Sequence, residues 1–155
     1  MIKKRLIINL LILCIFCVGC NMANYKISLP NNYNISSSSA NLVRLWTPSE
    51  GEVIPPKMVE ASWNDEYIVV KQVGLIYYDE NGKPCNTHPD SIQSKVPEVN
   101  EKIQHYWIVD MKENKKYGPY ETKKELIKKQ KELGIEKLKL KNLSEYNEQK
   151  DYGWE

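Results

Sequence analysis

The sequence predicts an α+β domain in which an antiparallel sheet of about five strands has one C-terminal helix packed against it. Short β-rich runs separated by turn residues fill the chain from residue 25 to residue 111. A single segment with helical periodicity and matching boundary residues follows at 122–134. Strands followed by a helix are typical of folds in which the helix covers one face of a sheet.

The first predicted elements are two short strands joined by a polar loop. Alternating residues favour a strand at 25–29, and a second strand is expected at 41–46. The segment 30–41 between them is rich in Asn and Ser and contains four consecutive serines. This composition is typical of a flexible loop. The turn residues at 48–51 end the second strand.

The clearest predicted element is a β-hairpin with Asn64-Asp65 as its turn. Before the turn, Ala61 and Trp63 alternate with polar residues, and a second β-rich run follows the turn. Both turn residues tolerate the left-handed backbone conformation of tight turns. The sequence therefore predicts two paired strands near the middle of the chain.

A long surface loop and a central strand are expected after the hairpin. Residues 77–97 combine three prolines and one glycine with little apolar periodicity, and long loops of this kind are often functional. The run at 104–111 has apolar residues on both faces, which is typical of a strand in the middle of a sheet. A turn is expected at 112–116.

The predicted helix has residue signals at both ends. Thr122 and Glu125 have the spacing of a capping box, and Gly134 is placed to end the helix. Leucine and isoleucine between these residues form a narrow apolar stripe, which predicts that one side of the helix packs on the sheet. A last short strand is expected at 135–140.

The N-terminus has the features of a bacterial lipoprotein signal peptide. A basic start precedes an apolar run that ends in Gly19-Cys20, so we expect cleavage before Cys20 and attachment of diacylglycerol, with palmitate-type chains, to its sulfur. As an uncleaved helical anchor, the apolar run would span only about 21 Å, against roughly 30 Å of hydrocarbon. The predicted divisions are a signal peptide at 1–19, one extracytoplasmic domain at 20–142 and a polar tail at 143–155.

Charge and cysteine content narrow the function classes. Without the three basic residues of the signal peptide, the formal charge changes from +2 to −1. Nucleic-acid binding is therefore not predicted, because it requires a persistent basic surface. Cys14 and Cys17 lie in the signal peptide and Cys20 carries the lipid, which leaves Cys85 without a partner for an internal disulfide.

Few residues offer catalytic or metal-binding chemistry. Cys85 and His88 share the long loop, but a zinc site needs three or four N or S ligands and the chain has two histidines, so no metal or cofactor is predicted. His105 is expected to be a partly buried strand residue with its ring nitrogens satisfied by neighbours. Glu60 and Asp110 lie on different predicted strands and could pair across a cleft as acid and base. Carboxylates at strand ends are common, however, so no glycosidase is predicted.

Aromatic residues are the candidate binding groups. Trp63, Tyr67, Trp107 and Tyr117 either build the core or, if exposed, form a platform for a peptide, a glycan or a membrane interface. Charge adds a second candidate surface, because residues 102–150 contain thirteen lysines and eight acidic residues. These lysines either solvate the helix or rest on anionic headgroups.

Several short motifs in order resemble one protein family. They are IPPK at 54–57, WND at 63–65, YI at 67–68, KQ at 71–72, YWIVD at 106–110 and YGP at 117–119, the last of them before a Lys/Glu-rich helix. This arrangement resembles the small lipoproteins of Gram-positive bacteria catalogued as domain of unknown function 3997, over roughly residues 25–140. The resemblance implies a lipid anchor and a shared fold, and no catalytic residues. Twenty lysines against two arginines agree with an AT-rich Gram-positive host.

A narrower stretch, 106–133, is similar to GYF-type adaptor domains. The similarity lies in the order of Trp107, a turn, Tyr117-Gly118-Pro119 and a helix. It implies binding of proline-rich peptides by aromatic residues. The same order also has a structural explanation, because Gly allows an unusual backbone angle and Pro ends a strand.

The sequence thus predicts a lipid-anchored protein on the outer face of the cell membrane. Its expected role is a non-enzymatic binding or interaction module of the cell envelope, whose partners are membrane lipid through Cys20 and an envelope protein or peptide. One alternative is a small envelope enzyme that uses Cys85, His88 or Asp110. Another is an immunity-type protein with its lysine-rich helix face toward the lipid.

Overall fold

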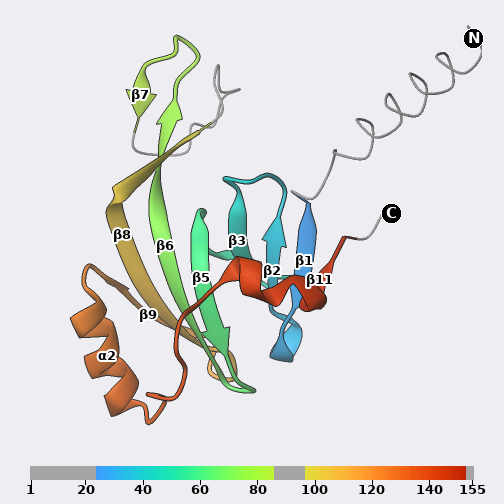
Figure 1. Cartoon of the computed structure of the whole chain (residues 1–155), viewed down its shortest axis with the longest axis vertical. Coiled ribbons are helices and arrows are strands. Elements are labelled where there is room, and N and C mark those ends of the chain that lie inside the picture. The colour runs from blue at the N-terminus through green and yellow to red at the C-terminus, as the bar shows by residue number, and fades with distance from the viewer. Residues whose placement is uncertain (1–23, 86–96, 153–155) are drawn as a thin grey trace, which may run out of the picture.

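The computed structural model describes residues 24–85 and 97–152 of the 155-residue chain. Within these ranges the strands form two antiparallel sheets, and one α-helix, α2 (Lys123–Glu132), lies against the larger sheet (Figure 1). The smaller, N-terminal sheet has the strand order β11-β1-β2-β3-β4. The larger, central sheet has the order β10-β5-β6-β8-β9, and β7 pairs with β6 outside that path.

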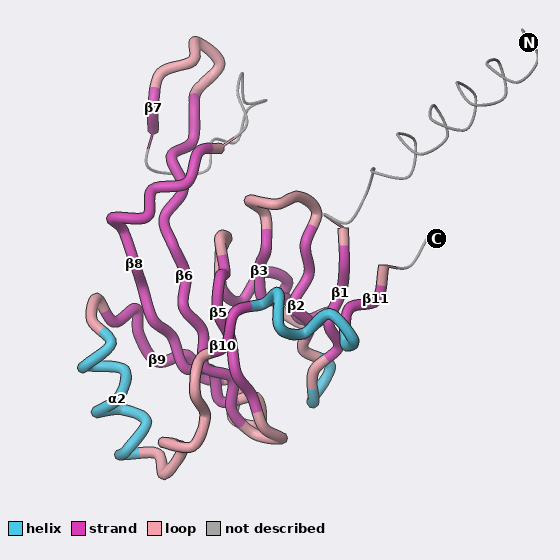
Figure 2. Tube along the Cα trace, in the orientation of Figure 1, coloured by secondary structure: helices cyan, strands magenta, loops and turns pink. Residues whose placement is uncertain are grey.

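The strands of the N-terminal sheet are β1 (Tyr25–Ser28), β2 (Asn34–Ser37), β3 (Val43–Thr47), β4 (Gly51–Ile54) and β11 (Lys150–Asp151). Those of the central sheet are β5 (Met58–Trp63), β6 (Tyr67–Tyr78), β7 (Pro84–Cys85), β8 (Glu98–Asp110), β9 (Lys115–Tyr120) and β10 (Lys141–Asn142). Two short 3₁₀ helices, η2 (Pro30–Asn32) and η3 (Leu143–Gln149), complete the described elements, as Figure 2 shows.

The predicted α+β class with a single five-stranded sheet is wrong, because the described chain is mostly β and builds two sheets. Several strands lack the apolar alternation on which the prediction depended. β2 lies in the Asn- and Ser-rich segment expected to be a loop, where Ile35 is the one large apolar residue and the polar Asn34 and Ser37 are also buried. β9 begins at Lys115, inside the expected turn at 112–116, and 135–140 forms no strand.

The main core lies between the two sheets. Side chains alternate between the two faces of a strand, so every second residue of each sheet points into this core. These inward-pointing residues are almost entirely apolar. Its most deeply buried residues include Ile27, Ile35 and Leu45 of the N-terminal sheet and Ile68, Val70 and Val109 of the central sheet. The expected central strand is confirmed in β8, because the opposite face of the central sheet is buried as well.

A second core lies between the central sheet and α2. Val69, Tyr106 and Ile108 contribute from the sheet, and Leu126 projects from the helix at 1% exposure. Full burial of one leucine contributes roughly 1.5–3 kcal/mol. The predicted capping box is present, since Thr122 Oγ1 accepts a bond from the Glu125 amide (3.3 Å) and the Glu125 carboxylate accepts one from the Thr122 amide (3.0 Å).

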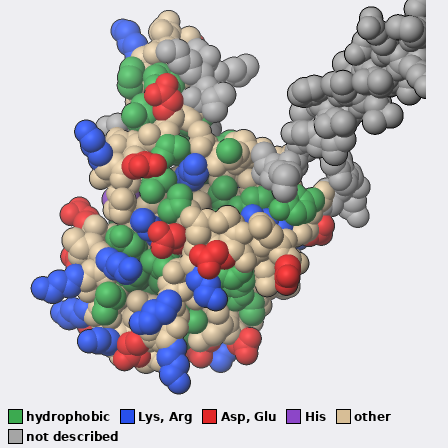
Figure 3. Space-filling model, viewed as in Figure 1, with side chains coloured by type: hydrophobic (Ala, Val, Ile, Leu, Met, Phe, Trp, Pro, Cys, Tyr) green, Lys and Arg blue, Asp and Glu red, His purple; other side chains and the backbone are tan. Residues whose placement is uncertain are grey.

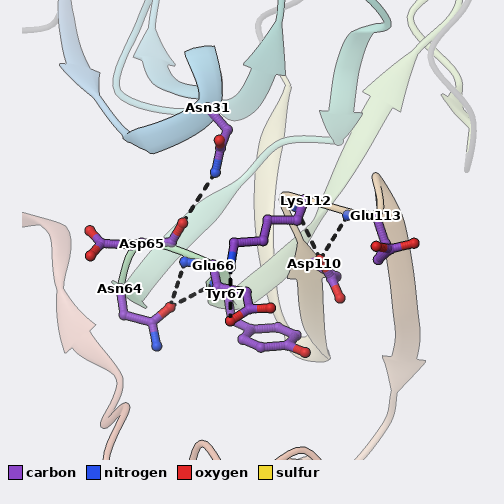
Figure 4. A network of polar contacts seen from close by, with 8 residues as sticks. All are labelled: Asn31, Asn64, Asp65, Glu66, Tyr67, Asp110, Lys112 and Glu113. Carbon is purple, nitrogen blue, oxygen red and sulfur yellow. Dashed lines mark hydrogen bonds and ion pairs between the residues drawn. The ribbon is translucent and has the colours of Figure 1, made fainter.

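The predicted hairpin is confirmed as β5 and β6, but its turn works differently from the prediction. Neither Asn64 nor Asp65 has the left-handed backbone. Instead, Asn64 Oδ1 accepts bonds from the amides of Glu66 (2.9 Å) and Tyr67 (2.7 Å), as Figure 4 shows. Asp110 closes the neighbouring β8–β9 turn in a similar way, so side-chain oxygens order both turns at this end of the central sheet.

The C-terminal segment joins the two sheets. The sequence predicts a polar tail at 143–155, and the described part of this segment, up to residue 152, carries η3 and β11. β10 pairs with β5 in the central sheet, whereas β11 pairs with β1 in the N-terminal sheet (Figure 2). Between them, the Tyr146 ring packs on Trp63 at 4.5 Å and its hydroxyl donates to Ala61 O at 3.1 Å.

Candidate functional site

A groove of about 780 Å³ lies beside β4, the edge strand of the N-terminal sheet. At this end of the molecule, β6 and β8 extend past the N-terminal sheet toward β7 (Figure 1). Leu42, Arg44, Glu52, Pro55 and Pro56 line one side. Gln72, Gly74, Leu75 and Tyr77 of β6, with Ile103 and His105 of β8, line the other. Ligand pockets typically have about 300–1,000 Å³ and a mainly apolar lining with a few polar groups, and this groove meets both criteria.

An irregularity in β8 shapes one wall. Val73 pairs with Gln104 but Gly74 pairs with Asn100, so residues 101–103 are inserted into the ladder. The insertion places Ile103 over Gly74, where a Cβ on the glycine would lie 2.8 Å from the Ile103 Cβ. Glycine is therefore required for this close approach. Ile103 remains 43% exposed and offers an apolar surface to the groove.

The floor is held by a buried amide. Gln72 is 6% exposed; its Nε2 donates to Pro56 O at 3.0 Å, and its Oε1 accepts a bond from Trp107 Nε1 at 2.8 Å. Gln72 thus ties the segment after β4 to both long strands of the central sheet.

His105 supplies an unsatisfied polar atom to the wall. It lies directly across the ladder from Gln72, as expected for a partly buried strand histidine. Its Nδ1 is buried and has no hydrogen-bond partner within the described ranges, contrary to the expectation that neighbours satisfy the ring. An unsatisfied buried nitrogen is unfavourable by roughly 1–3 kcal/mol, so a ligand group or a small shift that reaches it would stabilise the site.

A charged pair lies at the lip of the groove. Arg44 Nη1 is 3.4 Å from Glu52 Oε2, and its Nη2 donates to Ser38 Oγ at 3.4 Å. Both side chains of the ion pair are about a third exposed, at 33% and 39%. Burial, and then the Glu52 charge, raise the pKa of Tyr77 against the opposing effect of Arg44. Tyr77 therefore stays protonated and neutral inside the groove at physiological pH.

The free edge of β4 is protected against an added strand. β4 has four residues, its pairing with β3 is irregular between Leu45 and Trp46, and prolines follow it at 55 and 56. Lys116 Nζ also donates to Val53 O at 3.0 Å. Short length, irregular pairing, proline and lysine are all features that discourage edge-to-edge pairing. The groove therefore suits a compact ligand better than an extended peptide.

The four predicted binding aromatics do not form one platform. Trp63 and Trp107 pack against the core between the sheets, whereas Tyr67 and Tyr117 pack against the core under α2. Lys115 and Lys129 Nζ lie 5.0 Å and 4.8 Å from the centre of the Tyr117 ring. The Tyr-Gly-Pro motif has a local structural role, because a Cβ on Gly118 (φ +112°) would lie 2.6 Å from Tyr106 O.

The candidate catalytic residues are dispersed. Cys85 pairs with Tyr77 and Asp110 pairs with Tyr67, ten residues apart on β6, which corresponds to about 33 Å of strand. Glu60 is bound instead to Lys71 Nζ at 3.0 Å. Cys20 and His88 lie outside the described residues. No group of three potential metal ligands occurs in the ranges that the structure describes.

Sequence reasoning missed the groove residues Arg44, Gln72, Gly74 and Ile103. One signal was available: Gly74 interrupts an otherwise β-branched and aromatic run, and such a glycine often marks a bulge or a close backbone approach. Gln72 gave no signal, because its partners come from residues 56 and 107, which only the fold brings together.

Comparison with known proteins places the chain in a family. None of the described helices has the length and hydrophobicity needed to cross a bilayer. No curated protein and no solved structure matched the chain. A family model described as "Protein of unknown function (DUF3997)" matches residues 30–144, which span η2 to the start of η3 and include the whole groove. The chain therefore belongs to the DUF3997 family, as its ordered motifs predicted.

Proposed function

We propose that the protein is a lipid-anchored binding module of the cell envelope and that the groove beside β4 takes a small amphipathic ligand. The observation that carries the proposal is the composition of the groove. Apolar groups from Leu42, Leu75 and Ile103 share the lining with a few polar side chains, namely Arg44, Glu52, Gln72 and His105. Such sites bind apolar bodies and use a few polar contacts for orientation.

Binding is favoured over catalysis by the distribution of reactive groups. In the described part, Cys85 and Asp110 lie at opposite ends of β6, and neither lines the groove. General acid–base and nucleophilic mechanisms require their groups within hydrogen-bond reach of one another. The proposal therefore assigns no reaction to the groove.

The anchor is the second part of the proposal and depends on the N-terminal sequence. A basic start, a short apolar run and Gly19-Cys20 support lipid attachment at Cys20 on the outer face of the membrane. A Cys20→Ser variant should lose incorporation of labelled palmitate and remain unprocessed. Normal labelling of this variant would contradict the anchor without affecting the groove.

Photo-crosslinking in intact cells tests the groove. A photoreactive phenylalanine at position 103 of the full chain should capture a small molecule, detected as a mass increase of the protein. The matched control is the same residue at position 127 on α2, because Ile103 and Ile127 are equally exposed at 43% and 42%. Equal capture at both positions, or none at either, would overturn the proposed binding site.

The lysine-rich helix α2 is not proposed as a membrane-binding surface. Lys124, Lys128 and Lys131 are exposed on α2, and Figure 3 shows lysines gathered over this side of the molecule. α2 covers the face of the central sheet that is turned away from the N-terminal sheet (Figure 1). It therefore lies apart from β1, where the chain enters the domain from Cys20.

A further inference from the structure

We infer that the ligand of the groove is an anionic phospholipid taken from the adjacent bilayer, an inference that rests on the proposed function. The first support is the position of the groove relative to the start of the domain. Tyr25 pairs with Ser37, and Ser37 pairs with Val43, so the start of β1 and the start of β3 are two strand spacings apart. This separation is about 10 Å. Leu42 of the groove directly precedes Val43.

The length of chain before β1 limits the distance to the membrane. Four residues separate Cys20 from Tyr25, and the five Cα–Cα steps between them reach at most about 18 Å. With the acyl chains on Cys20 in the bilayer, the strand ends near Tyr25 must lie close to the headgroups. The lip of the groove, about two strand spacings away, is therefore within reach of lipid molecules in the outer leaflet.

Cations gather at this end of the two sheets. Tyr25, Lys57 and Lys150 line one shared hollow, and Lys150 Nζ lies 4.6 Å from the centre of the Tyr25 ring. Lys57 directly follows Pro56 of the groove, and its Nζ donates to Asn41 Oδ1 at 3.0 Å. Each basic residue near an anionic surface contributes about 1 kcal/mol of attraction. These charges favour anionic headgroups over neutral ones.

Arg44 is placed to bind the ligand's acidic group. Its guanidinium has five N–H donors, of which one is directed to Glu52 and one to Ser38. The three remaining donors can hold a phosphate in a forked arrangement, in which the phosphate competes with the Glu52 carboxylate that lines the same groove. The acyl chain would then lie along Leu75 and Ile103. An extended peptide is the less favoured occupant because the edge of β4 is protected.

Reconstitution with defined lipids tests the inference. The full lipidated protein with a photoreactive phenylalanine at position 103 is placed in phosphatidylcholine vesicles, with or without phosphatidylglycerol. We expect an adduct with the mass of phosphatidylglycerol, about fivefold or more above the yield at position 127. Arg44→Gln should reduce this adduct several-fold, whereas Lys131→Gln on α2, which removes an equal charge, should not.

Other results of these crosslinking experiments would contradict either the phospholipid assignment or the binding site itself. Equal capture of phosphatidylcholine, an adduct unaffected by Arg44→Gln, or a peptide adduct in cells would overturn the phospholipid assignment and leave the groove as a binding site. Absence of any adduct at 103, both in vesicles and in cells, would overturn the proposed function itself. If the residue at 103 prevents folding, as judged by circular dichroism, the photoreactive residue is moved to Leu42, which lines the opposite wall.

Discussion

Trp107 donates its indole N–H to the side-chain oxygen of Gln72 over 2.8 Å, and the same amide donates to the backbone of Pro56. One buried side chain therefore connects β6, β8 and the segment that follows β4. Both Trp107 and Gln72 face the space between the sheets, where water does not compete for these bonds. This connection sets the floor of the groove.

Replacing Gln72 by leucine should lower the free energy of unfolding by about 2–4 kcal/mol, because the Trp107 N–H and the Pro56 carbonyl both lose their partner. The measurement is denaturant unfolding followed by tryptophan fluorescence. Gln104→Leu is the matched control, since its bond to Glu101 O is exposed and the bond it accepts from Tyr106 OH is long at 3.4 Å, and it should lose no more than about 1 kcal/mol. Equal losses in the two variants would contradict the buried connection.

Gly74→Ala should destabilise the domain by about 1–3 kcal/mol, because the new Cβ would lie 2.8 Å from the Ile103 Cβ. Thermal unfolding of a double-mutant cycle checks the cause. The double variant Gly74→Ala, Ile103→Gly should lose less stability than the sum of the two single variants. The second substitution removes the Ile103 Cβ with which the new Cβ at position 74 would clash. Simple additivity would show that the two residues are not in contact.

Tyr146→Phe should reduce stability by about 0.5–1.5 kcal/mol through loss of the bond to Ala61 O, and the ring contact with Trp63 should persist. Tyr146→Ala loses the aromatic pair as well, which contributes about 0.5–1.5 kcal/mol beyond the buried area, so its loss should be clearly larger. Denaturant unfolding monitored by circular dichroism distinguishes the two variants. A neutral Tyr146→Ala variant would show that the C-terminal segment does not hold the sheets together.

Alkaline pH should unfold the protein. Burial is the main cause that raises the pKa values of Tyr25, Tyr33 and Tyr77 above the ordinary value near 10. The unfolded chain therefore releases these protons first, so the stability that the neutral tyrosines contribute is complete below pH 10 and is lost as the pH rises through their folded values.

The melting temperature, followed by circular dichroism from pH 8 upward, should hold steady and then fall above about pH 10. Tyr77→Phe removes one titrating group and should make the fall shallower, by at most about 1.4 kcal/mol per pH unit. An unchanged pH profile in this variant would mean that Tyr77 ionises as easily in the folded protein as in the unfolded chain.

Local sequence signals predicted the elements that local interactions build. Thr122 and Glu125 cap α2 as their spacing indicated, because both partners lie within one helical turn. The apolar alternation around Trp63 likewise identified β5, whose inner face is buried in the main core. In each case the residues that decide the structure are close together in the chain.

The strands predicted at 25–29 and 41–46 correspond to β1 and β3, but the separate N-terminal sheet escaped prediction because β2 and β11 depend on distant partners. Asn34 and Ser37 of β2 are buried only because β1 and β3 pair on either side, and nothing in their polarity indicates a strand. β11 has two charged residues and exists through its pairing with β1. The groove depends on the same long-range pairing, so its residues could not be found before the fold was known.

The pairing of Lys26 with Asp151 has a consequence for how the protein is made. The first strand of the domain, β1, cannot pair with β11 until residue 151 has emerged from the ribosome. Contacts so far apart in sequence slow folding. A nascent chain therefore cannot complete its N-terminal sheet before residue 151 is available, so this sheet is expected to close late in folding.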